Sequence, residues 1–293
     1  MQRVFSEAKL VKFPSSNGRV LNGLLYSKSQ NPNKIVIHIH GSFGNFYHND
    51  FIHFFAEKLN KRNVAVLTFN LTNHDGLSEG FFVDGRFEYV GGSVSNFDEA
   101  LSDIEGAICF VKSLYQNIEV ILQGHSLGCD RIIHYLIKEK KVLRFSLFSP
   151  CDSYELYNRW IGNKVVDVEI NNVLKNYRTG QWLNEYEYGV KNNGEEYVLP
   201  MKKETFESIV FSAPFYYLNL NLNPNFVIQA DCFICVCGKD PLQTYNSKEW
   251  FIYLEEHFPK SKKLFVENGD HDLNPCYDEI YLHYEKWILN DYK

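Results

Sequence analysis

The chain has 293 residues, of which 45% are hydrophobic and 23% charged, a composition that excludes a disordered or collagen-like polypeptide. Its 30 Lys and Arg residues are outnumbered by 36 Asp and Glu residues, so the formal charge is −6, and no basic stripe favours nucleic acid as a partner. Residues 1–13 lack the apolar core of a secretion signal, and no run approaches the roughly 18 apolar residues of a membrane span. We therefore expect a cytoplasmic protein without a membrane span.

The first predicted element in chain order is a β-hairpin. Residues 8–13 and 20–26 are short β-prone runs, and the Asn-Gly pair between them supports the positive φ angles of a tight turn. We expect these two strands to pair antiparallel.

After the hairpin, the strand candidates become continuously apolar instead of alternating. They are residues 34–40, 64–69, 120–123, 143–148, 232–236 and 263–266. Continuous apolarity is typical of strands covered on both faces, as in a parallel sheet.

Helical periodicity separates these strands. Apolar residues recur at spacings of three and four within residues 97–115, 132–137 and 280–288. Alternation of strands and helices predicts an α/β fold, with a mostly parallel central sheet and helices on both faces.

One long segment breaks the alternation. Residues 150–225 are polar and rich in Tyr, Trp and Phe, and a structureless loop of that length inside a compact domain is improbable. We predict a cap insertion at 150–225 on a core formed by residues 1–149 and 226–293. Some of its aromatic rings are expected to line a substrate pocket, and at least half to form the cap's own core.

The seven cysteines are scattered and odd in number, which fits a reducing compartment better than a disulfide framework. Cys232 and Cys235 form a C-x-x-C pattern, but they lie inside an apolar run without the second cysteine pair of a zinc site. Buried strand cysteines explain this pattern better than a metal or redox motif.

The most informative motif is Gly124-His125-Ser126-Leu127-Gly128, which stands between a predicted strand and a predicted helix. This G-x-S-x-G pattern is typical of a nucleophile elbow, in which glycines allow a sharp turn and the serine projects from its tip. Ser126 is the candidate nucleophile. The backbone N–H of Leu127 lies at a helix N-terminus, where it can stabilise developing negative charge.

A serine nucleophile requires a base and a group that orients the base. Asp240 and His271 each follow a predicted strand at its carboxyl end, the edge where parallel sheets place their sites. Asp152, after the preceding strand, remains an alternative acid. His271 is favoured as the base because other histidines lie in helical patterns typical of surface or core imidazoles, namely His53, His134, His257 and His283.

An oxyanion hole needs a second donor from another loop. The strand at residues 34–40 ends in His40-Gly41, and the backbone N–H of Ser42 or of Phe43 could supply that donor. His38 and His40 share one strand face and could instead ligate a metal, but no third ligand stands nearby, so we expect no metal.

Five features stand in the order typical of serine hydrolases, and their combination resembles the α/β-hydrolase superfamily. They are the His-Gly pair at 40–41, the loop at 73–80, the elbow at 124–128, Asp240, and the Gly-Asp-His sequence at 269–271. The likeness covers nearly the whole chain apart from the insertion, and it implies the α/β-hydrolase fold with a Ser-Asp-His triad. Asp75 stands where the family's loop more often has glycine, a departure that concerns the loop and not the triad.

Within the superfamily, the antiparallel start and residues 194–200 are faintly similar to fungal siderophore esterases. The expected function is cleavage of a carboxylic ester or thioester of a small acyl substrate through an acyl-enzyme, without a cofactor. The alternatives are an amidase or peptidase, and a non-catalytic ligand-binding protein on the same fold. The sequence indicates no oligomeric state.

Overall fold

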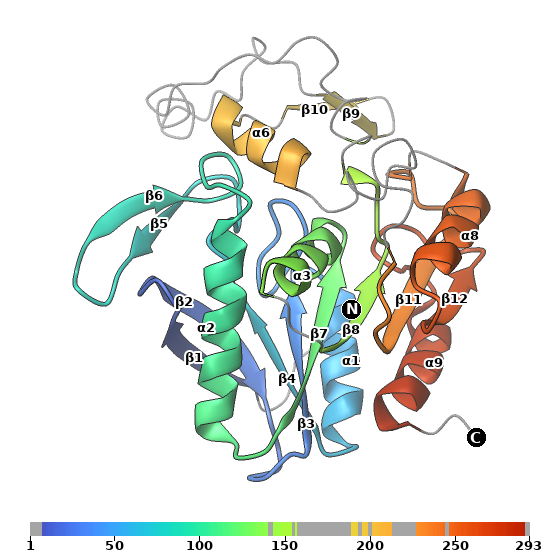
Figure 1. The fold of residues 1–293 in the computed structure, drawn as a ribbon, viewed down its shortest axis with the longest axis horizontal. Coiled ribbons are helices and arrows are strands. Elements are labelled where there is room, and N and C mark those ends of the chain that lie inside the picture. The colour runs from blue at the N-terminus through green and yellow to red at the C-terminus, as the bar shows by residue number, and fades with distance from the viewer. Residues whose placement is uncertain are drawn as a thin grey trace.

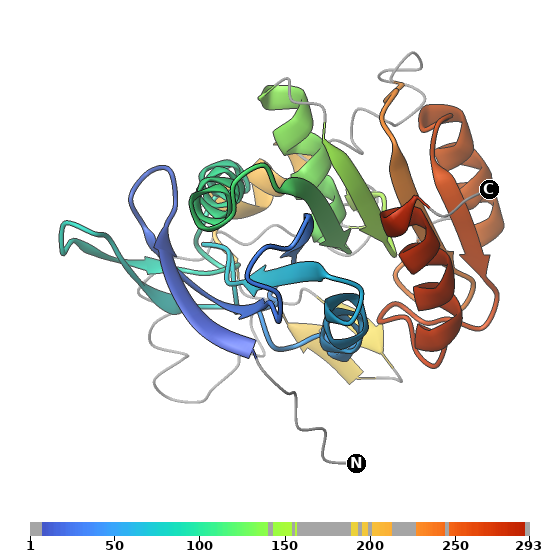
Figure 2. The same ribbon diagram turned by 90° about the horizontal axis from the view of Figure 1, so that it is seen from below.

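An eight-stranded sheet forms the centre of the protein, as the computed structural model in Figures 1 and 2 shows. The structure describes residues 8–139, 143–153, 156, 189–192, 195–198, 201–212, 227–243 and 246–290. The strands in spatial order are β1 (Ala8–Pro14), β2 (Val20–Tyr26), β4 (Val64–Phe69), β3 (Lys34–Ile39), β7 (Glu119–His125), β8 (Arg144–Phe148), β11 (Cys232–Cys237) and β12 (Lys262–Val266).

The sheet is mostly parallel, as predicted. β1 pairs antiparallel with β2, and β2 antiparallel with β4, whereas every neighbouring pair from β4 to β12 runs parallel. The predicted N-terminal hairpin is confirmed. The carboxyl ends of the parallel strands therefore meet at one edge of the sheet, which is where the candidate site residues stand.

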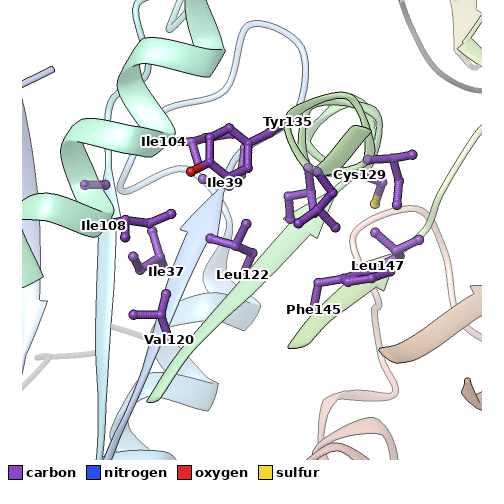
Figure 3. Close-up of a cluster of buried hydrophobic side chains, with 14 of the residues drawn as sticks. Ile37, Ile39, Ile104, Ile108, Val120, Leu122, Cys129, Tyr135, Phe145 and Leu147 are labelled. Atoms are coloured by element: carbon purple, nitrogen blue, oxygen red, sulfur yellow. The ribbon is translucent and has the colours of Figure 1, made fainter. Parts of the chain in front are cut away.

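Helices cover both faces of the sheet. They are α1 (Asp50–Asn60), α2 (Glu99–Leu114), α3 (Leu127–Lys138), α8 (Ser247–His257) and α9 (Tyr277–Leu289). The apolar stripes of α2, α3 and α8 enter one hydrophobic cluster, shown in part in Figure 3, and those of α1 and α9 enter another. Along β7, Val120 and Leu122 belong to the first cluster and Ile121 to the second, because successive side chains of a strand point to opposite faces.

The same alternation explains the C-x-x-C pattern. Cys232 lies in the first cluster and Cys235 in the second, so their thiols point to opposite faces of β11 and cannot bind one ion together. In the described ranges, no helix combines the length and apolarity needed to cross a bilayer.

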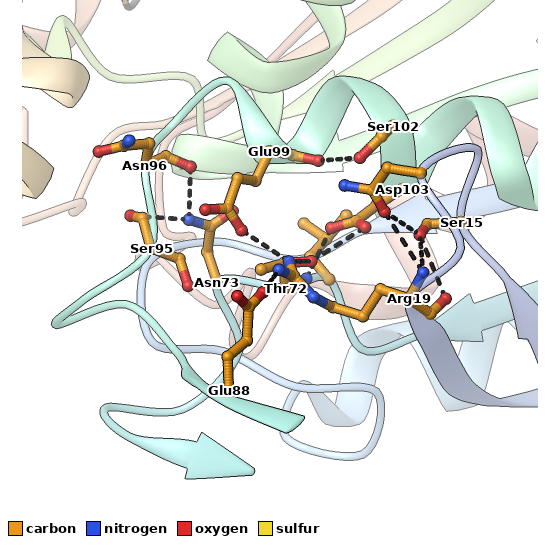
Figure 4. A network of polar contacts seen from close by, with 12 residues as sticks. Ser15, Arg19, Thr72, Asn73, Glu88, Ser95, Asn96, Glu99, Ser102 and Asp103 are labelled. Atoms are coloured by element: carbon orange, nitrogen blue, oxygen red, sulfur yellow. Dashed lines mark hydrogen bonds and ion pairs between the residues drawn. The ribbon is translucent and has the colours of Figure 1, made fainter. Parts of the chain in front are cut away.

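A second hairpin, β5 (Ser78–Phe81) with β6 (Phe87–Val90), projects from the core and was not predicted from the sequence. Arg19 connects this hairpin to the core, as Figure 4 shows. The Arg19 guanidinium forms ion pairs with Glu88 of β6 and with Glu99 of α2 (2.6 Å). Arg19 Nη1 also donates to Thr72 Oγ1 (2.6 Å), and Thr72 Oγ1 donates to the buried Asp103 (3.0 Å).

Three short elements are described within the predicted cap. They are the hairpin of β9 (Gly189–Asn192) and β10 (Glu195–Val198), and the helix α6 (Lys203–Ser212). Figure 1 shows them over the carboxyl edge of the sheet. Residues 154–155, 157–188, 193–194, 199–200 and 213–226 lie outside the described residues, so the cap boundaries stay a prediction.

Candidate active site

Ser126 stands at the turn between β7 and α3. Its backbone has φ 55° and ψ −130°, a conformation that a non-glycine residue adopts only under strain and that is frequent at functional turns. The turn is tight because glycines flank it: a Cβ on Gly124 would lie 2.7 Å from the backbone of Gly128, and one on Gly128 would collide with the carbonyl oxygen of Ile39. The predicted elbow is therefore present in the backbone.

Asp240 and His271 lie together at the carboxyl edge. Asp240 follows β11 and His271 follows β12, and since these strands are parallel neighbours, the two loops meet. His271 Nδ1–H donates a hydrogen bond of 2.8 Å to Asp240 Oδ2. Among the described residues, Asp152 is not a hydrogen-bond partner of His271, so the structure pairs the histidine with Asp240 and not with the alternative acid.

The environment of this pair favours a charged imidazole. Burial lowers the pKa of His271, but the hydrogen bond and the charge of Asp240 outweigh burial, so the pKa is raised above its ordinary 6.5. The Asp240 side chain is fully buried, whereas 14% of the His271 side chain is exposed. His271 can therefore exchange a proton with a ligand, while the Asp240 carboxylate is shielded from solvent.

Gln243 orients Asp240, a role that sequence reasoning missed. Its Nε2 donates to Asp240 Oδ2 (3.3 Å) and to the carbonyl oxygen of Pro150 (3.0 Å), while the backbone N–H of Leu242 donates to Asp240 Oδ1 (2.9 Å). Both carboxylate oxygens are thus fixed. A glutamine three residues after the predicted acid was the available signal.

His125 holds the loop of His271 against the elbow. The two rings lie 4.9 Å apart, and His125 Nε2 is 2.8 Å from the carbonyl oxygen of His271. Burial, and then the charge of His271, lower the pKa of His125 to about 4, so it is neutral near pH 7 and its proton sits on Nε2 to make this bond. No hydrogen bond joins Ser126 Oγ to the His271 ring among the described residues; catalytic hydrogen bonds in unliganded enzymes often form only with substrate.

The loop after β3 passes directly beside the serine. A Cβ on Gly41 would lie 2.9 Å from the Cβ of Ser126, so only glycine lets the loop approach this closely. Ser42, Phe43 and Leu127, the three predicted oxyanion residues, line one small pocket with a volume of about 10 Å³, room for a single water molecule. The structure thus brings the three together next to the elbow.

Two buried side chains hold this loop in place. Arg131 Nη1 donates to the carbonyl oxygens of His40 (2.9 Å) and Gly41 (3.3 Å). His40 accepts the backbone N–H of Leu71 at Nε2 (3.1 Å), which leaves Nδ1–H to donate to Gly41 (2.9 Å). Burial, and then the charge of Arg131, lower the pKa of His40 well below its ordinary value.

These contacts decide against a metal pair at His38 and His40. Both ring nitrogens of His40 are hydrogen-bonded to the backbone, and His38 Nδ1 lies 3.3 Å from Gln123 Nε2. The rival histidines also have structural partners where the contacts are given: His53 bonds to Tyr26 (2.7 Å) and His134 to Asp98 (2.8 Å).

α6 covers the elbow. Met201, Phe206, Ile209 and Val210 form an apolar cluster with Phe97 and Leu127, against which Phe43 packs. Two hydrogen bonds fix this segment to the core, from the backbone N–H of Phe97 to Ser208 Oγ (2.9 Å) and from that of Lys202 to the carbonyl oxygen of Ser93 (2.8 Å). The described part of the insertion is therefore anchored beside the candidate oxyanion residues.

No family model matches the chain, and no curated protein matches it by sequence. Solved structures do match over nearly the full length. The chain is similar to the esterase Est1E from Butyrivibrio proteoclasticus with ferulic acid bound (TM-score 0.65, 16% identity, 96% of this chain and 98% of that one). It is also similar to the Pyrococcus furiosus esterase Pf2001 (TM-score 0.61, 15%, 97% and 91%) and to the esterase domain of a Rhodothermus marinus protein (TM-score 0.59, 15%, 97% and 97%). The protein has the α/β-hydrolase fold.

Proposed function

We propose that the protein is a serine hydrolase that cleaves a carboxylic ester or thioester of a small molecule, with Ser126 as nucleophile, His271 as base and Asp240 as the orienting acid. The observation that carries the proposal is the 2.8 Å hydrogen bond from His271 to a buried Asp240, held by His125 against a strained serine turn. A serine turn of this kind without a paired histidine would support no such chemistry.

In the proposed reaction, Ser126 Oγ attacks the carbonyl carbon of the substrate while His271 Nε2 takes the serine proton. The carbonyl oxygen becomes an oxyanion, which accepts hydrogen bonds from the N–H of Leu127 and from that of Ser42 or Phe43. Collapse of this intermediate expels the alcohol or thiol, which receives the proton from His271. Water, deprotonated by His271, then releases the acid and restores the serine.

Asp240 contributes by fixing the tautomer in which Nδ1 carries the proton, so that Nε2 is free to accept one. It also stabilises the imidazolium that forms after the serine proton is taken, consistent with the raised pKa of His271. Arg131 and His40 act indirectly, by holding the backbone of the oxyanion loop.

An ester is favoured over an amide because its leaving group needs less assistance and because the neighbours named above are esterases. The predicted cap at residues 150–225 would form the roof of the substrate pocket, with α6 as its anchored part. A ligand-binding protein without turnover would not require the hydrogen bond between His271 and the buried Asp240.

The test is a substrate screen with p-nitrophenyl esters of graded chain length, acyl thioesters and aminoacyl amides. Ser126→Ala should abolish turnover and covalent labelling by a fluorophosphonate, whereas Ser113→Ala, on the exposed face of α2, should leave both unchanged. Labelling of Ser126→Ala at the wild-type rate would refute the proposed nucleophile. Labelling of the wild type without turnover of any substrate class would favour the non-catalytic alternative.

A further inference from the structure

The proposed hydrolysis does not use Cys151, yet the thiol of this residue lies beside Asp240 and His271. In the described part of the chain, donor atoms of Cys151, Asp240 and His271 all lie within 4.8 Å of one another. Cys151 follows β8, Asp240 follows β11 and His271 follows β12. Because these three strands are adjacent and parallel, their carboxyl-end loops converge.

Gln243 contacts both the thiol and the carboxylate. Gln243 Nε2 lies 3.3 Å from Asp240 Oδ2 and 3.9 Å from Cys151 Sγ. The Oε1 atom of the same amide is buried and has no hydrogen-bond partner among the described residues. The cluster therefore holds a thiol, an imidazole and a carboxylate.

This donor set suits a thiophilic divalent cation. Thiolate, imidazole and carboxylate are ligands of Zn²⁺, at roughly 2.3, 2.0 and 2.1 Å, which places tetrahedral donors about 3.3–3.6 Å apart. Donors that already lie within 4.8 Å reach these separations by small side-chain movements. Carboxylates of Asp130 and Asp152 near Cys151, and of Asp270 near His271, add negative potential that attracts a cation.

We propose that Cys151, Asp240 and His271 bind one thiophilic divalent cation, Zn²⁺ or Cd²⁺, and that the bound cation reversibly blocks the site. The thiol releases its proton to solvent as the sulfur–metal bond forms. The cation occupies His271 Nδ1 in place of the hydrogen bond to Asp240, and the imidazole proton moves to Nε2. An Nε2 that carries a proton cannot accept one from Ser126, so this blocking effect, unlike the binding itself, rests on the proposed function.

Binding is tested directly by titration with Cd²⁺, followed through the ultraviolet charge-transfer absorption of a cadmium–thiolate bond. We expect one Cd²⁺ per chain in the wild type and in Ser126→Ala, with equal affinity. Cys151→Ala should lower the affinity at least tenfold and remove the absorption, as loss of a direct ligand costs no less than loss of an outer-shell partner. The matched control is Cys109→Ala, which removes an exposed cysteine of α2 and should bind as the wild type does.

Cys151→Ser preserves the size of the side chain and serves as the second variant if Cys151→Ala does not fold. Wild-type affinity and absorption in a folded Cys151 variant would overturn the inference, as would their loss in Cys109→Ala.

The blocking effect is tested separately, by measuring ester hydrolysis. Zn²⁺ should inhibit ester hydrolysis by the wild type, EDTA should restore it, and the activity of Cys151→Ala should resist the Zn²⁺ concentration that half-inhibits the wild type. Cd²⁺ binding through Cys151 in a protein without hydrolase activity would refute the proposed function and leave the metal site standing. Hydrolysis that saturating Zn²⁺ does not affect would overturn the blocking effect.

Discussion

Two buried polar clusters of the protein differ in what they leave available for reaction. Around Asp103, both carboxylate oxygens accept hydrogen bonds from Thr72, and Arg19 completes the cluster with ion pairs to Glu88 and Glu99. Around Asp240, the carboxylate is equally satisfied, but His271 Nε2 has no hydrogen-bond partner in the described part of the chain. The first cluster is closed and holds loops together, whereas the second keeps one basic atom free beside a strained serine.

The sharpest test of this contrast is removal of the free basic atom. If the proposed triad is correct, His271→Ala should lower kcat for a p-nitrophenyl ester by roughly 10⁶, because the members of a triad act as a unit. The melting temperature should also fall, because the fully buried Asp240 carboxylate loses its imidazole partner, so kcat is compared on the folded variant. Activity within tenfold of the wild type would show that another group is the base.

The orienting acid gives the next largest effect. Asp240→Asn should lower kcat by about 10⁴, because the amide favours the wrong tautomer of His271 while preserving shape. Asp152→Asn, at the alternative acid, is the matched control and should retain activity within a few-fold. The opposite ranking of the two variants in kcat would reassign the acid.

In the closed cluster, the large effect should fall on stability instead of turnover. Arg19→Met removes the cation from the partly exposed Glu88 and Glu99 and the hydrogen bond to Thr72, and it should lower the free energy of unfolding by about 1–3 kcal/mol, measured by urea denaturation. The kcat of the folded variant should stay within a few-fold of the wild type. A variant as stable as the wild type would mean that the ion pairs contribute nothing net.

The pH dependence of stability sharpens the comparison further. Burial raises the pKa of Asp103 from 3.8 to about 7, so between these values the folded state holds a proton that the unfolded state has lost. The contribution of Asp103 to stability should therefore fall by about 1.4 kcal/mol per pH unit as the pH rises from 4 to 7, and level off above 7. Asp103→Asn should remove that slope from urea denaturation curves; an unchanged slope would assign it to other groups.

Sequence reasoning found those parts of the fold and site that local patterns encode. Continuous apolar strands such as residues 64–69 predicted the parallel sheet, and the glycines around Ser126 predicted the elbow, because both depend on neighbours in the chain. Asp240 and His271 were predicted to lie together because they follow strands whose carboxyl ends meet at one edge, and the structure joins them by a hydrogen bond of 2.8 Å.

What the sequence did not reveal depends on contacts between distant residues. The β5–β6 hairpin contains Glu79, Gly80 and Glu88 in place of an apolar pattern, and it is held by Arg19 from a different part of the chain. The hydrogen bond from His125 to the carbonyl oxygen of His271 joins residues 146 positions apart, so no local sequence spacing predicts it. Whether the N–H of Ser42 or that of Phe43 is the second oxyanion donor depends on the backbone orientation of one loop, which residue types do not specify.

The guanidinium of Arg131 joins two segments of the chain that lie beside Ser126. Arg131 belongs to α3, the helix that begins directly after Ser126. Its Nη1 donates hydrogen bonds to the carbonyl oxygens of His40 and Gly41, at the start of the loop that follows β3. The helix after the serine turn and the loop after β3 are thereby joined by hydrogen bonds from one side chain. If the proposed function holds, we expect variants that accept bulkier substrates to arise at Met201 and Ile209, which line the small pocket beside Leu127 and lie outside the proposed triad.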